Sequence, residues 1–292
     1  ALAPLPAIAG LVALASMATI IAVGSAVIFA TAIVLFDDLP SIEAVSGVQS
    51  QFFENSTIYA RDGTLLGELI DEGRRTVVST DQIPQLIKDA TIAAEDATFY
   101  DNPGVDLRAV VRAVWLNLQG GSIVSGFSTI TQQVVKNTLL SPEVTLKRKL
   151  REVALAYQLS QRFSKDEILG IYLNQSFYGQ RAYGIAAAAL TYFDKGLHEL
   201  SLGEAAMLAG IPRAPSTQSP LVNEEAAIRN QRNVLDLMVK GRSITRQQAD
   251  QAAAENLTYS RPERKLGPSP HFFNFVVDYL QERYGPEISS KG

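Results

Sequence analysis

Two carboxylates, Glu95 and Asp96, stand side by side at the end of an alanine-rich run that has the pattern of a helix. Phe99, Tyr100 and the turn-forming residues Asn-Pro-Gly at 102–104 follow directly. A carboxylate held at a helix end could act as a general base, and a second one beside it could bind a cation. Most acidic side chains are simply solvated, so this pair by itself favours an ordinary surface role.

A second polar segment has the sequence Gly-Phe-Ser-Thr-Ile-Thr-Gln-Gln at residues 126–133. It is typical of a glycine-led turn that enters a helix, where backbone N–H groups and Ser128 could hold an anion or sugar oxygens. By itself it could equally be a capped helix start. Lys136 follows about one helical turn later, which adds a positive charge near the same place.

The next helical segment is strongly basic and runs Lys-Arg-Lys-Leu-Arg-Glu at residues 147–152. On a helix, Arg148 and Glu152 share one face, and the ordinary interpretation is a surface ion pair worth roughly 0.2–0.5 kcal/mol. The apolar spacing predicts a buried stripe made of Leu146, Leu150, Val153 and Tyr157.

Composition excludes several other chemistries. The 292 residues include no cysteine, which excludes disulfides, thiolate nucleophiles and cysteine metal clusters. With only His198 and His271, a multi-histidine metal site or a serine–histidine triad is not expected. The 26 basic and 30 acidic residues give a net charge of −4, which argues against a nucleic-acid binder, and 47% hydrophobic content excludes disorder.

The elements that must position these groups begin with a long apolar segment. Residues 7–36 are an uncharged stretch, longer than the about 20 residues that span a bilayer and than the roughly 7–15 of a signal peptide. We therefore expect residues 1–36 to be an N-terminal segment with one transmembrane helix at 7–36. Acidic residues follow it and the first basic residue is Arg61, which favours an extracytoplasmic position for the rest of the chain.

Residues 37–83 are expected to form a connector and a small β element. Thr57–Ala60 and Thr64–Ile70 flank Arg61-Asp-Gly63, which is a hairpin turn signal. Beyond Pro84 the periodicity becomes helical and indicates an α-rich domain at 84–260. The predicted helices cover 84–99, 106–119, 129–140, 145–163, 165–175, 182–192, 201–210 and 223–239.

Residues 261–292 are expected to be a linker and the start of a missing or truncated C-terminal region. Proline and glycine are frequent up to Pro270, and an amphipathic helical pattern then resumes at Phe272–Tyr284. No Ser-x-x-Lys nucleophile motif with its companion motifs follows residue 260, so no transpeptidase activity is expected from these residues.

Together, the motifs resemble those of the peptidoglycan glycosyltransferases of family 51, the transglycosylase module of class A penicillin-binding proteins. The match covers roughly residues 57–240. The five motifs of the family correspond in order to residues 95–106, 126–137, 148–152, 165–184 and 204–215. Two positions depart from the pattern, because Asn102 stands where the family frequently has histidine and Val144 where an arginine often precedes the third motif. The second departure weakens one candidate phosphate contact.

The resemblance implies a mainly α, lysozyme-like helical glycosyltransferase domain with a small membrane-proximal β element, preceded by one transmembrane helix. It also implies the site. The catalytic residues would be Glu95 and Glu152, and the substrate-binding residues would be Asp96, Phe99, Ser128, Thr129, Gln132, Gln133, Lys136, Arg148 and Asn174.

The implied reaction is polymerisation of lipid II into glycan strands, with inversion at the anomeric carbon and release of polyprenyl pyrophosphate. Glu95 would take the proton of the acceptor hydroxyl, and Lys136 and Arg148 would receive the departing diphosphate. Glu152 would orient Arg148 or the acceptor sugar. No cofactor is required by the sequence, although a divalent cation, Mg²⁺ or Mn²⁺, could assist with Asp96 as its candidate ligand.

The expected partners are lipid II, the lipid-linked glycan, the membrane and other proteins of cell-wall synthesis, without nucleic acid. The expected location is the cell membrane, as a single-pass protein with its catalytic domain on the extracytoplasmic face. Two alternatives stay open. One is a membrane-anchored lysozyme-like peptidoglycan hydrolase, which would not need Lys136 and Arg148. The other is a non-catalytic cell-envelope scaffold.

Overall fold

The computed structural model describes Met17, Thr19 and residues 39–45, 56–69, 73–106, 128–143, 145–260 and 268–285. The transmembrane helix expected at 7–36, residues 107–119 of another expected helix, and Val144 therefore lie outside the described residues, apart from Met17 and Thr19. Within the described ranges, no helix combines the length and the apolar character needed to cross a bilayer.

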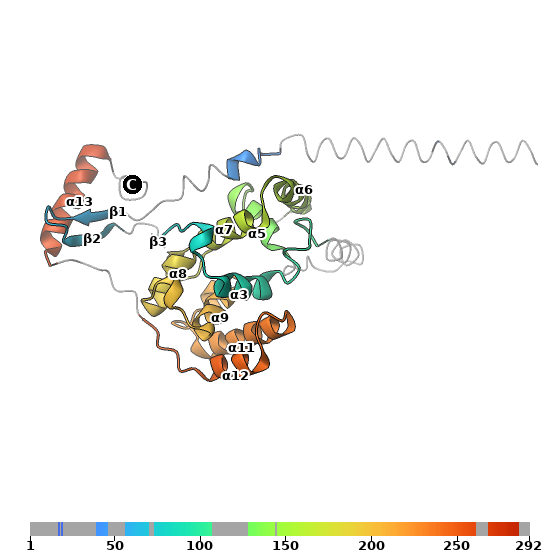
Figure 1. Ribbon diagram of the computed structural model, residues 1–292. Coiled ribbons are helices and arrows are strands. Elements are labelled where there is room, and N and C mark those ends of the chain that lie inside the picture. The colour runs from blue at the N-terminus through green and yellow to red at the C-terminus, as the bar shows by residue number, and fades with distance from the viewer. Residues whose placement is uncertain are drawn as a thin grey trace, which may run out of the picture.

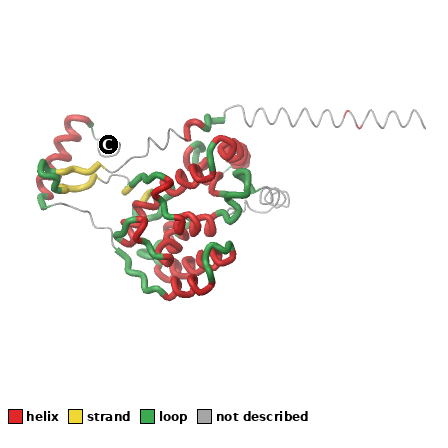
Figure 2. The backbone as a smooth tube through the Cα atoms, viewed as in Figure 1, coloured by secondary structure: helices red, strands yellow, loops and turns green. Residues whose placement is uncertain are grey.

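The described residues form mainly α-helices, as the sequence predicts (Figure 1 and Figure 2). Two short 3-10 turns, η1 at Thr80–Gln82 and η2 at Leu197–Glu199, connect them. The helices of the main body are α3 at Gln85–Glu95, α5 at Ile130–Thr138, α6 at Leu146–Arg162, α7 at Lys165–Gln175, α8 at Ile185–Phe193, α9 at Leu202–Gly210, α10 at Pro215–Gln218, α11 at Glu224–Lys240 and α12 at Arg246–Ala254.

Hydroxyl side chains fix the starts of several helices. Thr129, Ser164, Ser201 and Thr245 cap α5, α7, α9 and α12, each paired with a Gln or Glu three residues later in a capping box. The two reciprocal hydrogen bonds satisfy N–H groups that a helix start would otherwise leave without partners. The last of these helices, α12, was not among the expected ones, although its Thr245-x-x-Gln248 box is visible in the sequence.

The core lies around α7 and α8, which are buried on nearly all sides. Residues 168–175 of α7 and 185–189 of α8 are all buried. α8 is almost entirely apolar and therefore suits the interior of the protein, whereas the buried part of α7 also contains the polar residues Asn174 and Gln175. The amphipathic helices surround them, since α5 packs on α6 and α7, and α3 packs on α9 and α11.

The stripe that α6 buries differs from the expected one. Tyr157 is 50% exposed, and Leu150 and Val153 are only half-buried. The inward side instead carries Glu152, Leu155, Ala156 and Leu159, all at 1% exposure or less. Leu155 and Leu159 offer an alternative stripe at helical spacing, and the helix is rotated so that its ion-pair face turns inward. The Arg148–Glu152 pair is therefore not the surface pair of the ordinary interpretation.

The expected hairpin is confirmed. β1 at Ser56–Tyr59 pairs antiparallel with β2 at Leu65–Leu69 around the Arg61–Gly63 turn. The amphipathic C-terminal segment forms α13 at Pro270–Tyr284, whose fully buried Phe273 packs against Leu66 of β2. Figure 1 shows the hairpin and α13 together, to the left of the helical body.

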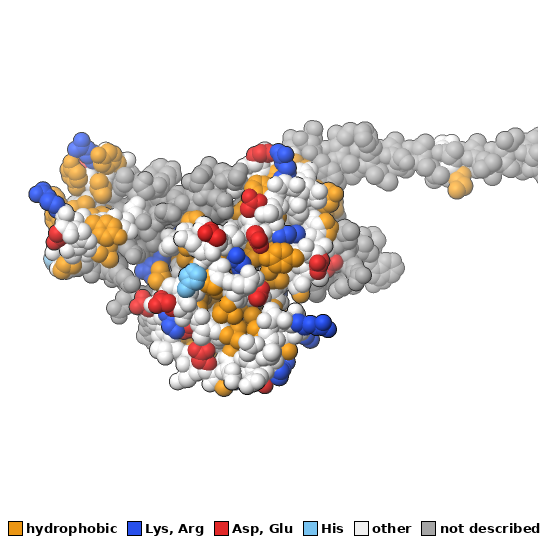
Figure 3. All heavy atoms as spheres, in the orientation of Figure 1, with side chains coloured by type: hydrophobic (Ala, Val, Ile, Leu, Met, Phe, Trp, Pro, Cys, Tyr) orange, Lys and Arg blue, Asp and Glu red, His pale blue; other side chains and the backbone are white. Residues whose placement is uncertain are grey.

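A short parallel pair joins the segment after the hairpin to the helical body. β3 at Arg74–Arg75 pairs with β4 at Ala182–Tyr183, directly before α8. On the face shown in Figure 3, acidic and basic side chains are interspersed rather than gathered by sign. This distribution agrees with the mixed charge of the sequence.

Gly104 is expected to be essential for packing the turn after α3 onto α6. Its φ is +93°, and a Cβ placed there would lie 2.4 Å from the carbonyl oxygen of Ala156. Replacing Gly104 with Ala should lower the free energy of unfolding by about 2–5 kcal/mol, from backbone strain and the clash together. Gly63, with φ +83° and nothing within 4 Å, is the matched control and should lose only about 1–2 kcal/mol. Equal losses in urea denaturation would contradict this account.

Candidate active site

Glu95 is the last residue of α3 and its carboxylate is held from two sides. The side chain is 5% exposed, and its Oε2 accepts a 2.7 Å hydrogen bond from Nε2 of Gln133 on α5. Its Oε1 lies 3.9 Å from Nε of Arg213, whose Nη2 also donates to the Ala94 carbonyl at 2.9 Å. Arg213 therefore caps the end of α3 as well as facing the carboxylate, with a side chain that is 56% exposed.

Asp96 is 8% exposed and both of its carboxylate oxygens accept hydrogen bonds within the protein. Asn102 Nδ2 donates to them at 3.0 and 3.1 Å, and Thr98 Oγ1 donates at 3.2 Å. The backbone N–H of Ile130, in the first turn of α5, donates at 3.3 Å. Asp96 thus ties the turn after α3 to the start of α5. Among the described residues, no group of three or more His, Cys, Asp or Glu is placed to hold a metal ion.

Asn102, one of the two departures from the family pattern, has a clear place in this turn. Besides donating to Asp96, its Oδ1 accepts from the Gly104 N–H at 2.9 Å. Lys165 Nζ donates to the Asn102 carbonyl at 2.7 Å and lies 4.7 Å from the ring centre of the fully buried Phe99. Desolvation lowers the pKa of Lys165, and the nearby charge of Asp96 opposes that shift. Asn102 therefore connects Asp96 and Gly104 of the first motif with Lys165 of the fourth.

The start of α5 is fixed by Thr129 and Gln132, which are 3% and 2% exposed. Thr129 Oγ1 donates to the Gly104 carbonyl at 2.6 Å and also accepts from the Gln132 N–H. The Gln132 side chain accepts from the Thr129 N–H to complete the capping box. Both side chains thus make contacts within the protein that orient α5, and the neighbouring Gln133 is the one that reaches Glu95.

Ser128, Arg148, Lys149 and Glu152 form a compact group that we call the α6 cluster. Lys149 Nζ donates to Ser128 Oγ at 2.7 Å and makes a close ion pair with Glu152. Arg148 Nη1 lies 3.1 Å from Oε2 of Glu152, which is 1% exposed. Two cations balance one buried carboxylate, so the cluster keeps one net positive charge. The Nε of Arg148 is buried and has no hydrogen-bond partner among the described residues.

Lys136 is exposed and lies three residues after Gln133 on α5. Residues at this spacing share one helix face, so Lys136 extends from the same side of α5 that contacts Glu95. Ser128, which holds Lys149, comes directly before the cap of the same helix. Helix α5 therefore carries Gln133, the partner of Glu95, and Lys136 on one face, and Ser128 of the α6 cluster precedes the start of this helix.

Asn174 is placed differently from the other predicted site residues. It is 1% exposed, and its Oδ1 accepts from the Val78 N–H at 3.0 Å. Its Nδ2 donates to the carbonyls of Val78 and Gly170 at 2.8 and 2.9 Å. These contacts hold the segment before η1 against α7, and none of them involves Glu95 or the α6 cluster.

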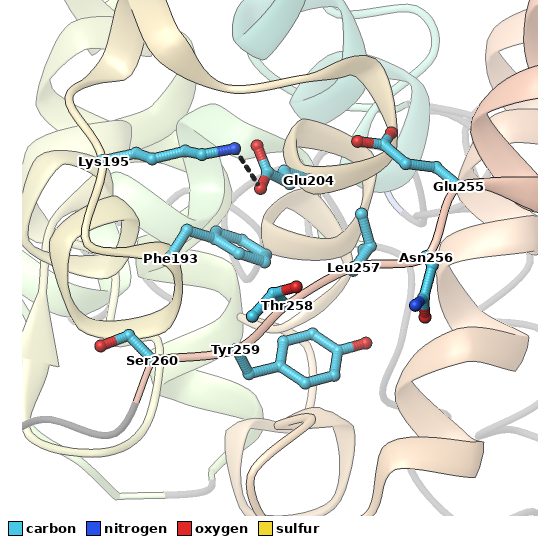
Figure 4. Close-up of a pocket in the computed structure, with 9 residues that line it drawn as sticks. All are labelled: Phe193, Lys195, Glu204, Glu255, Asn256, Leu257, Thr258, Tyr259 and Ser260. Carbon is cyan, nitrogen blue, oxygen red and sulfur yellow. Dashed lines mark hydrogen bonds and ion pairs between the residues drawn. The ribbon is translucent and has the colours of Figure 1, made fainter.

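A pocket of about 250 Å³ lies between the end of α8, the start of α9 and residues 255–260 (Figure 4). Lys195 Nζ donates to Oε1 of Glu204 across it at 2.7 Å. None of the predicted catalytic or substrate-binding residues lines this pocket. It is therefore separate from the group of residues around α5.

Comparison with known families decides the classification. The family model described as transglycosylase matches residues 62–239. The chain belongs to the transglycosylase family. This confirms the resemblance predicted from the five motifs, all of which lie inside the matched residues of this transglycosylase.

The relatives of this transglycosylase are longer proteins. Penicillin-binding protein 1A of Neisseria meningitidis serogroup A is 44% identical over 261 residues, which are 89% of this chain and 32% of that protein. Penicillin-binding protein 1A of Escherichia coli K12 is 41% identical over 87% of this chain and 30% of that protein. The chain also matches the crystal structure of penicillin-binding protein 1A from Haemophilus influenzae, with 29% identity and a TM-score of 0.48. This match covers 81% of this chain and 25% of the Haemophilus chain. The chain thus spans about a third of the relatives' length or less.

Two cationic residues of this arrangement, Arg213 and Lys149, are absent from the residues proposed from sequence. Arg213 is the basic residue between Pro212 and Ala214 of the fifth motif, and Lys149 is flanked by other charged residues in the third. Their types and positions were visible, but only the structure shows that they contact Glu95 and Glu152.

Replacing Asn102 with Ala should lower the free energy of unfolding by about 1–3 kcal/mol, because the buried Asp96 loses its two amide contacts. An Asn102→His variant should recover part of the loss, since a ring N–H can donate to the same carboxylate. Urea denaturation of both variants measures this. An alanine variant as stable as the native chain would contradict the role given to Asn102.

Replacing Asn174 with Ala should lower the free energy of unfolding by about 2–4 kcal/mol, because three hydrogen bonds are lost and the Val78 backbone groups lose their partners. Asn233, exposed on α11, is the matched control and should change stability by less than about 0.5 kcal/mol. If Asn174→Ala kept full stability in thermal unfolding but bound substrate less tightly, its role would be substrate binding instead.

Proposed function

We propose that this transglycosylase polymerises lipid II into glycan strands, with inversion at the anomeric carbon and release of polyprenyl pyrophosphate. The observation that carries the proposal is the arrangement around α5, where a held carboxylate, Glu95, is accompanied by Lys136 and the positively charged α6 cluster. The reaction needs both a base and a site for a departing anion. The name of the similar proteins, penicillin-binding protein 1A, agrees with a role in the cell wall.

Glu95 serves as the general base in this proposal. A sugar hydroxyl is a weak nucleophile, and a positioned carboxylate that removes its proton contributes roughly 10²–10⁴-fold to the rate. The contacts from Gln133 and Arg213 fix the orientation of the carboxylate. The Glu95 side chain is 5% exposed and that of Arg213 is 56% exposed, so the acceptor sugar approaches Glu95 from the side of Arg213 in this proposal.

Arg148, Lys149 and Lys136 receive the diphosphate in this proposal. Negative charge grows on the leaving group as the glycosidic bond breaks, and fixed cations stabilise it most in the transition state. Arginine offers a planar fork that matches two phosphate oxygens. The Arg148 side chain is 16% exposed, and the exposed Lys136 adds a mobile charge.

Glu152 is assigned the orienting role rather than that of a second base. It is almost fully buried and paired with both Arg148 and Lys149. A buried carboxylate that holds two cations fixes their side chains in a single geometry. This supports orientation of Arg148 as its function. Asp96, Thr129 and Gln132 act at the site through the position of α5. Gln133 contacts Glu95, Ser128 contacts Lys149, and the buried Phe99 lies against Lys165.

The remaining expectations belong to the same proposal. The helical domain at 84–260 adopts a lysozyme-like arrangement with the hairpin near the membrane, and a transmembrane helix at 7–36 holds it on the extracytoplasmic face. Lipid II and the lipid-linked glycan are membrane lipids, so an anchored enzyme meets them at the height of the headgroups. Other cell-wall synthesis proteins are its partners, and a divalent cation could assist the diphosphate.

Replacing Glu95 with Gln should lower the rate of lipid II polymerisation by 10²-fold or more, because an amide cannot remove the proton from the hydroxyl of the acceptor sugar. The fold should be retained, since a glutamine oxygen can still accept the hydrogen bond from Gln133. The measurement is release of polyprenyl pyrophosphate from lipid II by the full chain in detergent. Glu225, 90% exposed on α11, provides the matched Glu→Gln control and should stay at the native rate.

Two results would refute parts of the proposal. An active Glu95→Gln enzyme would remove Glu95 from the role of base. Shortening of preformed glycan, without diphosphate release from lipid II, would establish the hydrolase instead. Glu152→Gln should reduce turnover less than Glu95→Gln does, and the opposite order would exchange their roles.

A further inference from the structure

The pocket of about 250 Å³ beside the start of α9 combines apolar and polar side chains in a small space. Figure 4 shows Lys195, Glu204 and Glu255 along its upper side. The rings of Phe193 and Tyr259 lie below them. Pockets for drug-sized ligands measure roughly 300–1,000 Å³. A cavity of this size therefore suits one small ring-shaped unit rather than a long lipid chain.

The wall formed by residues 255–260 is held in place at both ends. At one end, Ser201 Oγ donates to Oε2 of Glu255 at 2.8 Å. At the other end, the N–H of Ser260 donates to the Tyr192 carbonyl at 2.7 Å. These contacts are internal to the protein, so the shape of the pocket is largely preformed, as is usual for ligand sites.

The middle of the same wall carries polar groups that the protein leaves open. Asn256 and Thr258 are exposed and line the pocket. With the part of the chain that the structure describes, neither their side chains nor the backbone of residues 256–259 forms a hydrogen bond. An amide supplies two donors and an acceptor, and a hydroxyl supplies one donor and accepts as well. These groups are therefore available to a ligand that carries several hydroxyls.

Two aromatic rings supply the apolar part of the pocket. Phe193 is 6% exposed and Tyr259 is half-buried, and their ring centres lie 6.0 Å apart. Phe193 closes the inner side, and Tyr259 presents the more accessible ring. The carbon–hydrogen face of a sugar can pack on the negative face of an aromatic ring, while the sugar hydroxyls pair with amide and carboxylate groups at its edge. The pocket offers both kinds of partner.

The charges of the pocket disfavour an anion. One lysine lines it with two glutamates, and Lys195 Nζ is already paired with the buried Glu204 at 2.7 Å. The lining thus carries one net negative charge, which repels phosphate or carboxylate groups. A purely apolar ligand would displace water from Asn256 and Thr258 without replacing its hydrogen bonds, which costs free energy. An uncharged sugar avoids both costs.

Helix α9 connects the pocket with the surroundings of Glu95. Glu204 lies in the first turn of α9, and Arg213, which is near Glu95, follows the last residue of that helix by three positions. The nine residues of α9 span about 13 Å at 1.5 Å per residue. The pocket and Arg213 therefore lie near opposite ends of one short helix, a separation that a chain of several sugar rings can cover.

We propose that this pocket is a second saccharide site, which binds one uncharged sugar ring of the growing glycan away from Glu95. The choice of the glycan as ligand rests on the proposed function. The pocket takes no part in bond formation. By holding the strand, it increases the number of additions that occur before the strand is released.

The test measures occupancy of the pocket directly. Because the chain has no cysteine, an Ala254→Cys variant of the full chain can carry a single environment-sensitive fluorophore at the exposed residue before Glu255. Titration with the tetramer of N-acetylglucosamine should change its fluorescence in a saturable way. Adding Asn256→Ala and Thr258→Val should weaken the affinity about tenfold, since two hydrogen-bonding side chains are lost. Asn233→Ala on α11 is the matched control and should keep the native affinity.

The melting temperature of the double variant should stay at the native value, because both side chains are exposed and make no hydrogen bond with the described residues. The absence of a fluorescence response to the tetramer would overturn the inference, and so would equal affinity in the double variant. A saturable response to inorganic pyrophosphate would also overturn it, since the pocket would then be an anion site.

An assay with lipid II separates this inference from the proposed function. The Asn256→Ala/Thr258→Val enzyme should release shorter glycan strands than the native chain, and Asn233→Ala should release strands of native length. Native strand length in the double variant would refute the holding role. If the native chain fails to polymerise lipid II, the proposed function fails, whereas saturable binding of the tetramer would still support a saccharide site in the pocket.

Discussion

The hydrogen bond from Gln133 to Glu95 joins the end of α3 to one face of α5, and the arrangement of the site depends on it. It can form only because α5 is fixed at its start. Thr129 holds the Gly104 carbonyl, and Asp96 accepts from the backbone of Ile130. The same helix start also meets α6 through the bond from Lys149 to Ser128. One correctly placed helix therefore sets both the proposed base and the proposed anion site.

Buried carboxylates impose a common constraint on this arrangement. The Glu95 side chain is 5% exposed, and residues Asp96 and Glu152 are 8% and 1% exposed. A buried charge without partners is strongly unfavourable. Glu95 has an amide and a nearby guanidinium as partners. Asp96 has an amide, a hydroxyl and a backbone N–H. Glu152 has two cations. This constraint explains how Asn102 can replace a histidine, because the amide supplies the donor that Asp96 requires.

Local sequence patterns predicted much of the fold. The hairpin follows from its Asp-Gly turn, and the capping boxes mark the starts of α5 and α7. The predicted buried stripe of α6 was wrong because the helix has two apolar stripes. Only packing against the surrounding core selects the stripe that contains Leu155 and Leu159. The short helix α12 was missed because its sequence is mostly polar and alanine, with only Ala249 and Ala252 buried.

The sequence by itself determined the family, the mainly helical architecture and the residue types of the site, since ordered motifs and helical periodicity are properties of the chain alone. Only the tertiary structure decided which residues meet. Arg213 lies near Glu95, Lys149 donates to Ser128, and Asn174 holds the Val78 backbone. These contacts join segments far apart in the chain. They depend on how each helix is rotated against the core, which no local pattern specifies.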